Sequence, residues 1–187
     1  MYKRQLADQR ERAKLELTRD VVFAAWSGEE LGLLGSSHFV RDLAKQALGD
    51  ESAPLGLLIS SYLNRDMIGR LADKLVLQGT GSSDYWEGAI ERRNAPIGLP
   101  ITIQPDTYLP TDATNFYLRK IPILSAFTGA HADYHTPRDT VDKINYEGTA
   151  DIAKLMGLIV RELSIDGAGP KYVNCLLYTS PSPRDAS

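Results

Sequence analysis

Short apolar runs that alternate with helical segments constrain the fold of this chain more than any other feature of its sequence. Apolar runs bounded by turn residues, which we expect to form strands, occupy 21–26, 55–69, 74–79, 100–106 and 121–129. Helical spacing of apolar residues is found at 36–48, 83–95, 111–120 and 152–163. This alternation favours an α/β fold in which a sheet lies between helices and carries its functional groups at the strand ends.

The last helix has the clearest pattern of all the helical segments. Its apolar residues form one stripe after Asn145, a plausible cap, and they are Ile152, Leu155, Met156, Ile159, Val160 and Leu163. We expect Ser36 or Ser37 to cap the helix at 36–48, and Thr111 to cap the one at 111–120. The charged segment 6–18 is predicted to be the end of a further helix.

The two ends of the chain differ in character from the rest. MYKRQ at 1–5 and CLLYTSPSPRDAS at 175–187 resemble translations of a sequencing adapter read in its two directions, and we expect 175–187 to be disordered. The remaining segment, 6–174, has the length of one domain. It contains no cysteine, since the only one in the chain is Cys175, so thiol catalysis and internal disulfides are not expected there.

Composition and charge exclude two classes of partner. The chain is 43% hydrophobic and 24% charged, with a formal net charge of −3, which is the balance of an ordinary globular protein. No basic patch interleaved with aromatic residues is present, so we expect no nucleic-acid binding. No apolar run reaches the roughly 18–20 residues that a membrane-spanning helix needs.

Carboxylates follow two of the predicted strands. In AAWSGEELGLLGS (24–36), Glu29 and Glu30 follow the run 21–26 after Ser27 and Gly28, and adjacent carboxylates repel each other unless a proton or a cation intervenes. The other interpretation is that acidic residues are favoured in the first turn of a helix. Asp66, in NRDMIG, also follows a predicted strand and suits a hard or borderline cation, although a lone Asp beside Arg65 is more often a turn residue or half of a surface ion pair.

Two of the three histidines lie in one segment, TGAHADYHTPRDTVDKI (128–144). His131 and His135 are four residues apart, but Gly129 and Pro137 argue against a regular helix, so the segment is predicted to be a loop. A loop histidine beside a carboxylate is a good candidate metal ligand, because the carboxylate fixes its tautomer. A histidine held by hydrogen bonds within the loop is the alternative, and His38 is expected on the surface of a helix.

Three stretches taken together resemble the bacterial M28-type zinc aminopeptidases in order and spacing. They are VVFAAWSGEELGLLGS (21–36), NRDMIGR (64–70) and PTDATNFYLRKIPILSAFTGAHADYHTPRDTVDKINYEG (110–148). The resemblance implies a three-layer α/β/α sandwich with a mixed, mostly parallel sheet and a two-zinc site at its strand ends. It implies in turn a zinc-dependent exopeptidase, most simply an aminopeptidase with a peptide substrate, exported from the cytoplasm as a secreted or periplasmic protein.

The resemblance also implies a role for individual residues. Glu29 corresponds to the general base, which takes a proton from the attacking water and passes one to the leaving amine. Glu30 and His135 correspond to ligands that share one zinc, and Asp66 to a ligand of the other. Tyr134 is a candidate oxyanion donor. The segment TDATNF, with Asp112 and Phe116, corresponds to one that lines the site.

The chain departs from the family pattern ahead of Glu29. Family members carry an upstream His ligand in a His-x-Asp stretch and an upstream Asp that bridges both zincs, whereas residues 6–28 contain no histidine and no matching motif. We therefore expect 6–174 to be a partial catalytic domain, truncated at its N-terminus, that binds zinc weakly and hydrolyses little or nothing.

Two other functions remain compatible with these residues. One is a glutaminyl-cyclase-like transferase, which uses a single zinc on the same fold. The other is a non-catalytic, peptidase-like binding domain, which the retained carboxylates and His135 argue against. The sequence upstream of this chain would discriminate among the three, because a two-zinc peptidase requires both further ligands.

Overall fold

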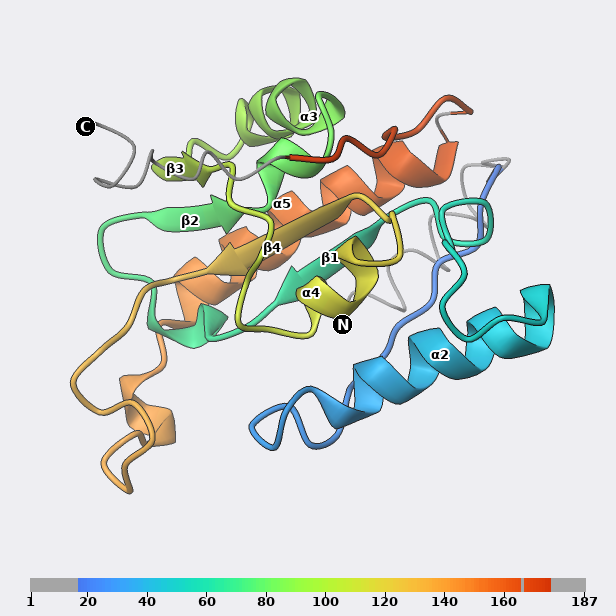
Figure 1. Cartoon of the computed structure of the whole chain (residues 1–187). Helices are drawn as coiled ribbons and strands as arrows, with labels where there is room; N and C mark the ends of the chain where they lie inside the picture. The colour runs from blue at the N-terminus through green and yellow to red at the C-terminus, as the bar shows by residue number, and fades with distance from the viewer. Residues whose placement is uncertain (1–16, 166, 176–187) are drawn as a thin grey trace, which may run out of the picture.

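A computed structural model describes residues 17–165 and 167–175, and a four-stranded sheet lies at its centre (Figure 1). The strands are β1 (Tyr62–Arg65), β2 (Leu75–Gln78), β3 (Ile101–Gln104) and β4 (Ile123–Phe127), in the order β1-β4-β2-β3. β1 runs parallel to β4 and β2 runs parallel to β3, while β2 and β4 are antiparallel. The predicted mixed, mostly parallel sheet is therefore confirmed.

Helices cover both faces of this sheet, as predicted for an α/β/α sandwich (Figure 1). The α-helices are α2 (Leu34–Leu48), α3 (Tyr85–Asn94), α4 (Ala113–Tyr117) and α5 (Tyr146–Ile165). The 3-10 turns are η1 (Ile68–Arg70), η2 (Thr80–Ser82) and η3 (Val141–Lys143). α3 and α5 pack on one face, and α2 and α4 pack on the other.

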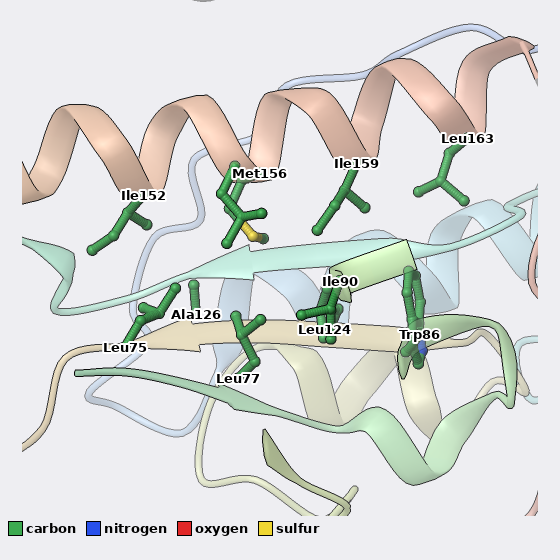
Figure 2. Close-up of a cluster of buried hydrophobic side chains, with 11 residues drawn as sticks. Leu75, Leu77, Trp86, Ile90, Leu124, Ala126, Ile152, Met156, Ile159 and Leu163 are labelled. Carbon is green, nitrogen blue, oxygen red and sulfur yellow. The ribbon is translucent and has the colours of Figure 1, made fainter. Parts of the chain in front are cut away.

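The alternation of side chains along β4 creates the two halves of the core. Leu124 and Ala126 face the cluster under α3 and α5, whereas Ile123 faces the cluster under α2 and α4, as the two-residue period of a strand requires. Five residues of the predicted α5 stripe are buried in the first cluster (Figure 2), namely Ile152, Leu155, Met156, Ile159 and Leu163. The sixth, Val160, is half-buried and borders the hollow beside β1 instead. Asn145 caps α5 by accepting the N–H of Gly148 at 2.8 Å, as predicted.

The predicted strand at 55–69 and the predicted helix at 36–48 have other bounds in the structure. The run 55–61 forms turns, and β1 begins only at Tyr62, because Leu55 is anchored by its N–H to the carbonyl of Arg119 (2.8 Å) while Leu57 points into solvent. α2 begins at Leu34, so neither serine caps it. Thr111 does accept the N–H of Ala113, at 3.4 Å, at the start of α4.

The run 21–26 is not a strand, which corrects the prediction for this segment. Within the described residues no strand pairs with it, and an extended segment without a partner strand leaves its backbone groups to water. It runs beside β1, the edge of the sheet, with a hollow between them. The predicted helix 6–18 lies almost wholly outside the described residues, and Leu17 and Thr18 are not helical. Residues 1–5 and 176–187 also lie outside them.

Across the described part of the chain, none of the helices has the length and apolar character that crossing a bilayer would require.

A buried carboxylate joins α3 to α5. Glu162 accepts bonds from Arg92 (2.7 Å), the Tyr85 hydroxyl (3.0 Å) and the Nε of Arg93, and its side chain is 9% exposed. Burial alone would raise the pKa of Glu162, but the hydrogen bonds of these three partners outweigh it and lower the pKa below its ordinary value of 4.5.

We expect this network to make the stability of the fold depend on pH. Because the pKa is lowered by folding, the stabilisation is complete above pH 4.5 and is lost as pH falls through the folded value. Glu162→Gln should lower the free energy of unfolding by about 1–2 kcal/mol at pH 7 and by much less at pH 3. Urea unfolding of both proteins at the two pH values measures this, and an equal difference at both would contradict the assignment.

Candidate functional site

The two adjacent glutamates lie on a tight double turn in front of α2. The N–H groups of Gly32 and Leu33 both donate to the carbonyl of Glu29, at 3.0 and 2.9 Å. Gly28 has a φ of +66°, which an L side chain rarely adopts, and a Cβ there would approach Leu34 to 3.2 Å. The turn therefore points the two carboxylates differently: Glu29 is half-buried, and Glu30 is exposed.

An aromatic anchor holds this turn although the run before it is not a strand. The indole N–H of Trp26 donates to the hydroxyl of Tyr62 (3.0 Å), which in turn donates to the side chain of Asn64 (3.0 Å) on β1. The Trp26 ring packs on Phe39 at 5.1 Å, and Tyr62 stacks on Phe116 at 3.8 Å. Side-chain contacts, rather than the backbone hydrogen bonds of a strand pair, therefore hold the turn of Glu29 against β1 and the helices.

Asp66 lies at the carboxyl end of β1, where the topology brings it near the same site. Its N–H donates to the carbonyl of Ala126 (3.2 Å), which extends the pairing of β1 with β4 by one residue. The ion pairs among the described residues do not include Arg65 with Asp66, so the alternative interpretation of Asp66 as half of a surface ion pair finds no support.

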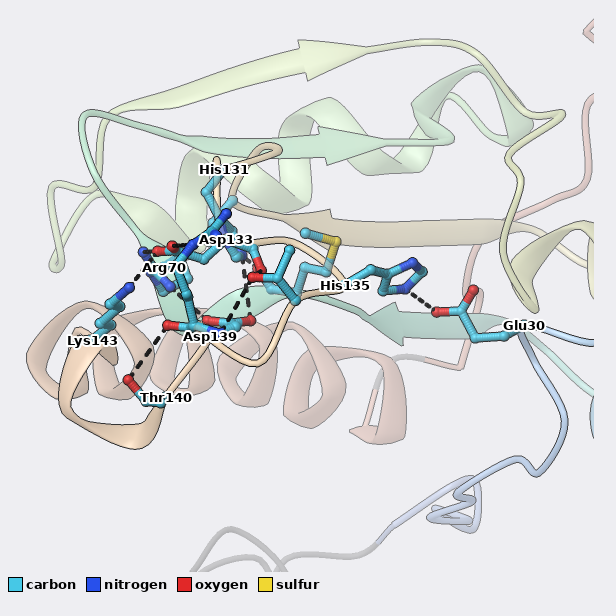
Figure 3. A network of polar contacts seen from close by, with 12 residues as sticks. Glu30, Arg70, His131, Asp133, His135, Asp139, Thr140 and Lys143 are labelled. Atoms are coloured by element: carbon cyan, nitrogen blue, oxygen red, sulfur yellow. Dashed lines mark hydrogen bonds and ion pairs between the residues drawn. The ribbon is translucent and has the colours of Figure 1, made fainter.

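The segment after β4 forms the predicted loop and brings His135 to the glutamates. It folds as successive turns, in which Tyr134 bonds back to His131 and Thr136 to Asp133. His135 Nε2 lies 2.6 Å from Glu30 Oε1 (Figure 3). The Tyr134 ring stacks on the imidazole at 3.8 Å. The backbone of His135 has a φ of 54°, which costs a residue other than glycine about 1–3 kcal/mol.

The four carboxylates of this region act on one another. The pKa of Glu29 is raised, first by burial and then by the charges of Glu30, Asp66 and Asp112, while His135 acts in the opposite direction. Burial also raises the pKa of Asp66, and Glu30 and Asp112 add to the shift. The site therefore carries a negative field that a bound cation would relieve.

Two hollows meet at Glu30. The larger, of about 1560 Å³, lies between residues 19–26 and β1 and has Glu29, Glu30 and Asp66 on its wall, with Asp112 and Phe116. The smaller, of about 590 Å³, is bordered by Glu30, Tyr134 and His135. An extended ligand lying across the site would contact the carboxylates on one side and the aromatic ring and imidazole on the other.

The other two histidines are not part of this pairing. His131 Nε2 lies 3.7 Å from Asp139 Oδ2, within the loop, and His38 is exposed on α2. The sequence interpretation missed the residues that support the site, namely Trp26 and Tyr62 on one side and Arg70 on the other. Their roles depend on contacts between segments that are distant in the sequence, so no local sequence pattern indicates them.

The donor set fits zinc in kind. A carboxylate oxygen and an imidazole nitrogen are ligands that zinc commonly takes in proteins, and Glu30 and His135 bring one of each together. Among the described residues, however, no group of three or more His, Cys, Asp or Glu side chains could hold a metal ion. The described pair could therefore supply part of a zinc site.

The described part of the chain is an α/β/α sandwich with Asp66 at the carboxyl end of β1 and with Glu30 and His135 meeting on adjacent turns. The sequence profile of peptidase family M28 matches residues 3–160, and the chain belongs to this family.

Relatives and solved structures agree with the assignment. The chain is 32% identical over 126 residues to leupeptin-inactivating enzyme 1 of Streptomyces exfoliatus, covering 64% of this chain and 25% of that protein. It is 29% identical over 161 residues to leucine aminopeptidase 2 of Trichophyton rubrum, covering 70% and 30%. The chain thus spans between a quarter and a third of these relatives' length.

Two solved structures show the same fold. A zinc aminopeptidase from Bacillus subtilis matches with a TM-score of 0.58 and 26% identity, covering 74% of this chain and 34% of that one. The LapA aminopeptidase of Legionella pneumophila matches with a TM-score of 0.68 and 19% identity, covering 82% and 41%, and this likeness concerns the fold alone.

Proposed function

We propose that the protein to which this chain belongs is a zinc-dependent aminopeptidase, with peptides as substrates. The observation that carries the proposal is the meeting of Glu30 and His135, 105 residues apart in sequence, at 2.6 Å beside Glu29. Membership of family M28, and relatives whose names include an aminopeptidase, support the reaction class.

Each residue of the site has a part in the proposed reaction. Glu29, half-buried on its turn, takes a proton from the attacking water and later passes one to the leaving amine. Glu30 and His135 would hold one zinc, and Asp66 would belong to a second. Zinc bound there would acidify a water and polarise the scissile carbonyl. Tyr134, 44% exposed and stacked on His135, donates its hydroxyl to the developing oxyanion.

We propose further that the chain of 187 residues binds zinc weakly and hydrolyses little. It has three histidines, and of these His135 alone meets a carboxylate of the candidate site. Asp66 would hold its ion without a histidine partner from the described part of the chain. A weakly held zinc leaves the base without an acidified water to act on.

Calorimetric zinc titration and a peptidase assay test the proposal. We expect the 187-residue chain to bind zinc no more tightly than about micromolar. We expect no release of the N-terminal residue from an unblocked leucyl peptide above background. Submicromolar affinity together with turnover would contradict the weak site.

The reaction class is tested on a longer natural form that includes both further family ligands. That form should cleave the unblocked peptide but not its N-acetylated control, because an aminopeptidase requires the free amine. Cleavage of the acetylated peptide would contradict an aminopeptidase, and cyclisation of an N-terminal Gln peptide would indicate the transferase instead.

A further inference from the structure

We propose that Arg70 is a positioning residue for the candidate site, because its guanidinium holds the turn that presents His135 to Glu30 (Figure 3). The inference rests on the proposed function in one respect, that His135 is a zinc ligand. The placing of the turn by Arg70 is a separate statement about the structure, and it can be tested separately.

The guanidinium of Arg70 spans the turn on both sides of His135. Its Nη1 donates to Asp139 Oδ1 at 2.6 Å, and its Nη2 donates to Asp133 Oδ2 at 3.1 Å. One carboxylate precedes His135 by two residues and the other follows it by four, so a single planar group clamps the turn across the histidine. The side chains of Arg70 and Asp133 are 21% and 17% exposed, whereas that of Asp139 is 41% exposed, so the ion pair with Asp133 is the better shielded from solvent.

The segment that carries Arg70 also holds the base of the loop. The Thr128 hydroxyl donates to the carbonyl of Met67 where the loop leaves β4. The N–H of Asn145 donates to the carbonyl of Gly69 (2.9 Å) where the loop enters α5. Both ends of the loop are therefore fixed on the backbone around η1, and Arg70 fixes its middle.

Arg70 in this way joins the two halves of the site. η1 begins two residues after Asp66, the candidate ligand at the end of β1, and it ends with Arg70. The clamp thus links the segment of Asp66 to the turn of His135 through side chains, in addition to the pairing of β1 with β4.

The backbone of His135 explains why a clamp is needed. A φ of 54° in a residue other than glycine persists only where its surroundings hold it. The imidazole also faces Glu30 from an exposed position, with 54% of its side chain accessible, so packing alone does not place it. Lys143, which bonds Asp133 at 2.8 Å, supports one side of the turn but does not reach across to Asp139.

The test compares Arg70→Gln with the unchanged chain by two measurements that do not need turnover. Loss of a group that orients a zinc ligand typically costs 10–100-fold in metal affinity, and we expect this for zinc measured by calorimetry. We expect the amide protons of Tyr134, Thr136 and Asp139, which close the turns of the loop, to exchange faster with solvent. The amide protons of β4 should keep their protection.

Matched variants separate positioning from a general loss of stability. Arg92→Gln makes the same chemical change in an ion pair of 2.7 Å on α3 and should alter neither zinc affinity nor loop exchange. Arg70→Lys, which keeps the charge but not the planar fork, should restore only part of the affinity. Asp139→Asn breaks one arm of the clamp and provides a milder variant should Arg70→Gln fail to fold.

The outcomes distinguish the two proposals. Unchanged zinc affinity and unchanged loop exchange in Arg70→Gln or Asp139→Asn would overturn the positioning role. An unchanged chain that binds no zinc would refute the proposed function for this chain, and the exchange of the loop amides would still decide whether Arg70 holds the turn.

Discussion

Replacement of His135 by Ala is expected to weaken zinc binding by at least about a hundredfold, because it removes the nitrogen donor of the pair with Glu30. Calorimetric titration at high protein concentration measures this even if the unchanged chain binds weakly. Loss of the imidazole should leave the fold intact, since the side chain is 54% exposed and belongs to neither core cluster.

A matched control makes this prediction specific. His131→Ala removes the other imidazole of the same loop, which contacts Asp139 rather than Glu30, and it should change zinc affinity less than about threefold. A larger loss in His131→Ala than in His135→Ala would show that the sequence comparison chose the wrong histidine.

The adjacent glutamates allow a second comparison within the same turn. Glu30→Gln should weaken zinc binding, because an amide is a poorer ligand than a carboxylate, whereas Glu29→Gln should leave the affinity nearly unchanged. In a form of the protein that hydrolyses peptide, Glu29→Gln should instead lower kcat by about 10²–10⁴-fold. Equal zinc affinities for the two variants would contradict the division of roles between them.

The parts of this molecule that could be predicted from sequence are those that depend on local periodicity. The stripe of α5 and its cap at Asn145 follow from spacing alone, as do the strands β2, β3 and β4. The run 21–26 has the same apolar character and yet forms no strand, because pairing depends on a neighbouring strand that periodicity does not reveal.

The residues of the candidate site also fall into two groups, those that a local sequence pattern indicates and those that it does not. The sequence could propose Glu29, Glu30, Asp66 and His135 as site residues because each follows an apolar run that predicts a strand or lies in a motif-bearing loop. Arg70 was not, since an arginine after a strand has many uses, and its clamp exists only because the topology brings the two loops together. Ser36 shows the same limit: predicted as a cap, it instead donates its buried hydroxyl to Asp112 across two helices.

A second prediction with a large expected effect concerns the stability of the fold and rests on Ser82. Its side chain is fully buried, and its hydroxyl oxygen accepts the N–H of Ile123 (2.9 Å) and the indole N–H of Trp86 (3.0 Å). The hydroxyl proton lies within reach of the carbonyls of Gly79 (2.6 Å) and Ile123 (2.9 Å). One small side chain thus joins η2, β4 and α3.

We expect Ser82→Ala to lower the free energy of unfolding by about 2–5 kcal/mol, because it leaves two buried donors without this acceptor at about 1–3 kcal/mol each. Urea unfolding measures the change, and Ser52→Ala, at an exposed serine, should change stability by less than about 0.5 kcal/mol.

A double-mutant cycle identifies the origin of the loss. Trp86→Phe removes one of the two donors, so adding Ser82→Ala to it should cost less than Ser82→Ala alone. Strictly additive effects would mean that the indole N–H finds another partner and that the hydroxyl stabilises the sheet mainly through Ile123. In either case, a loss of the expected size would identify η2 as a structural junction between β4 and α3.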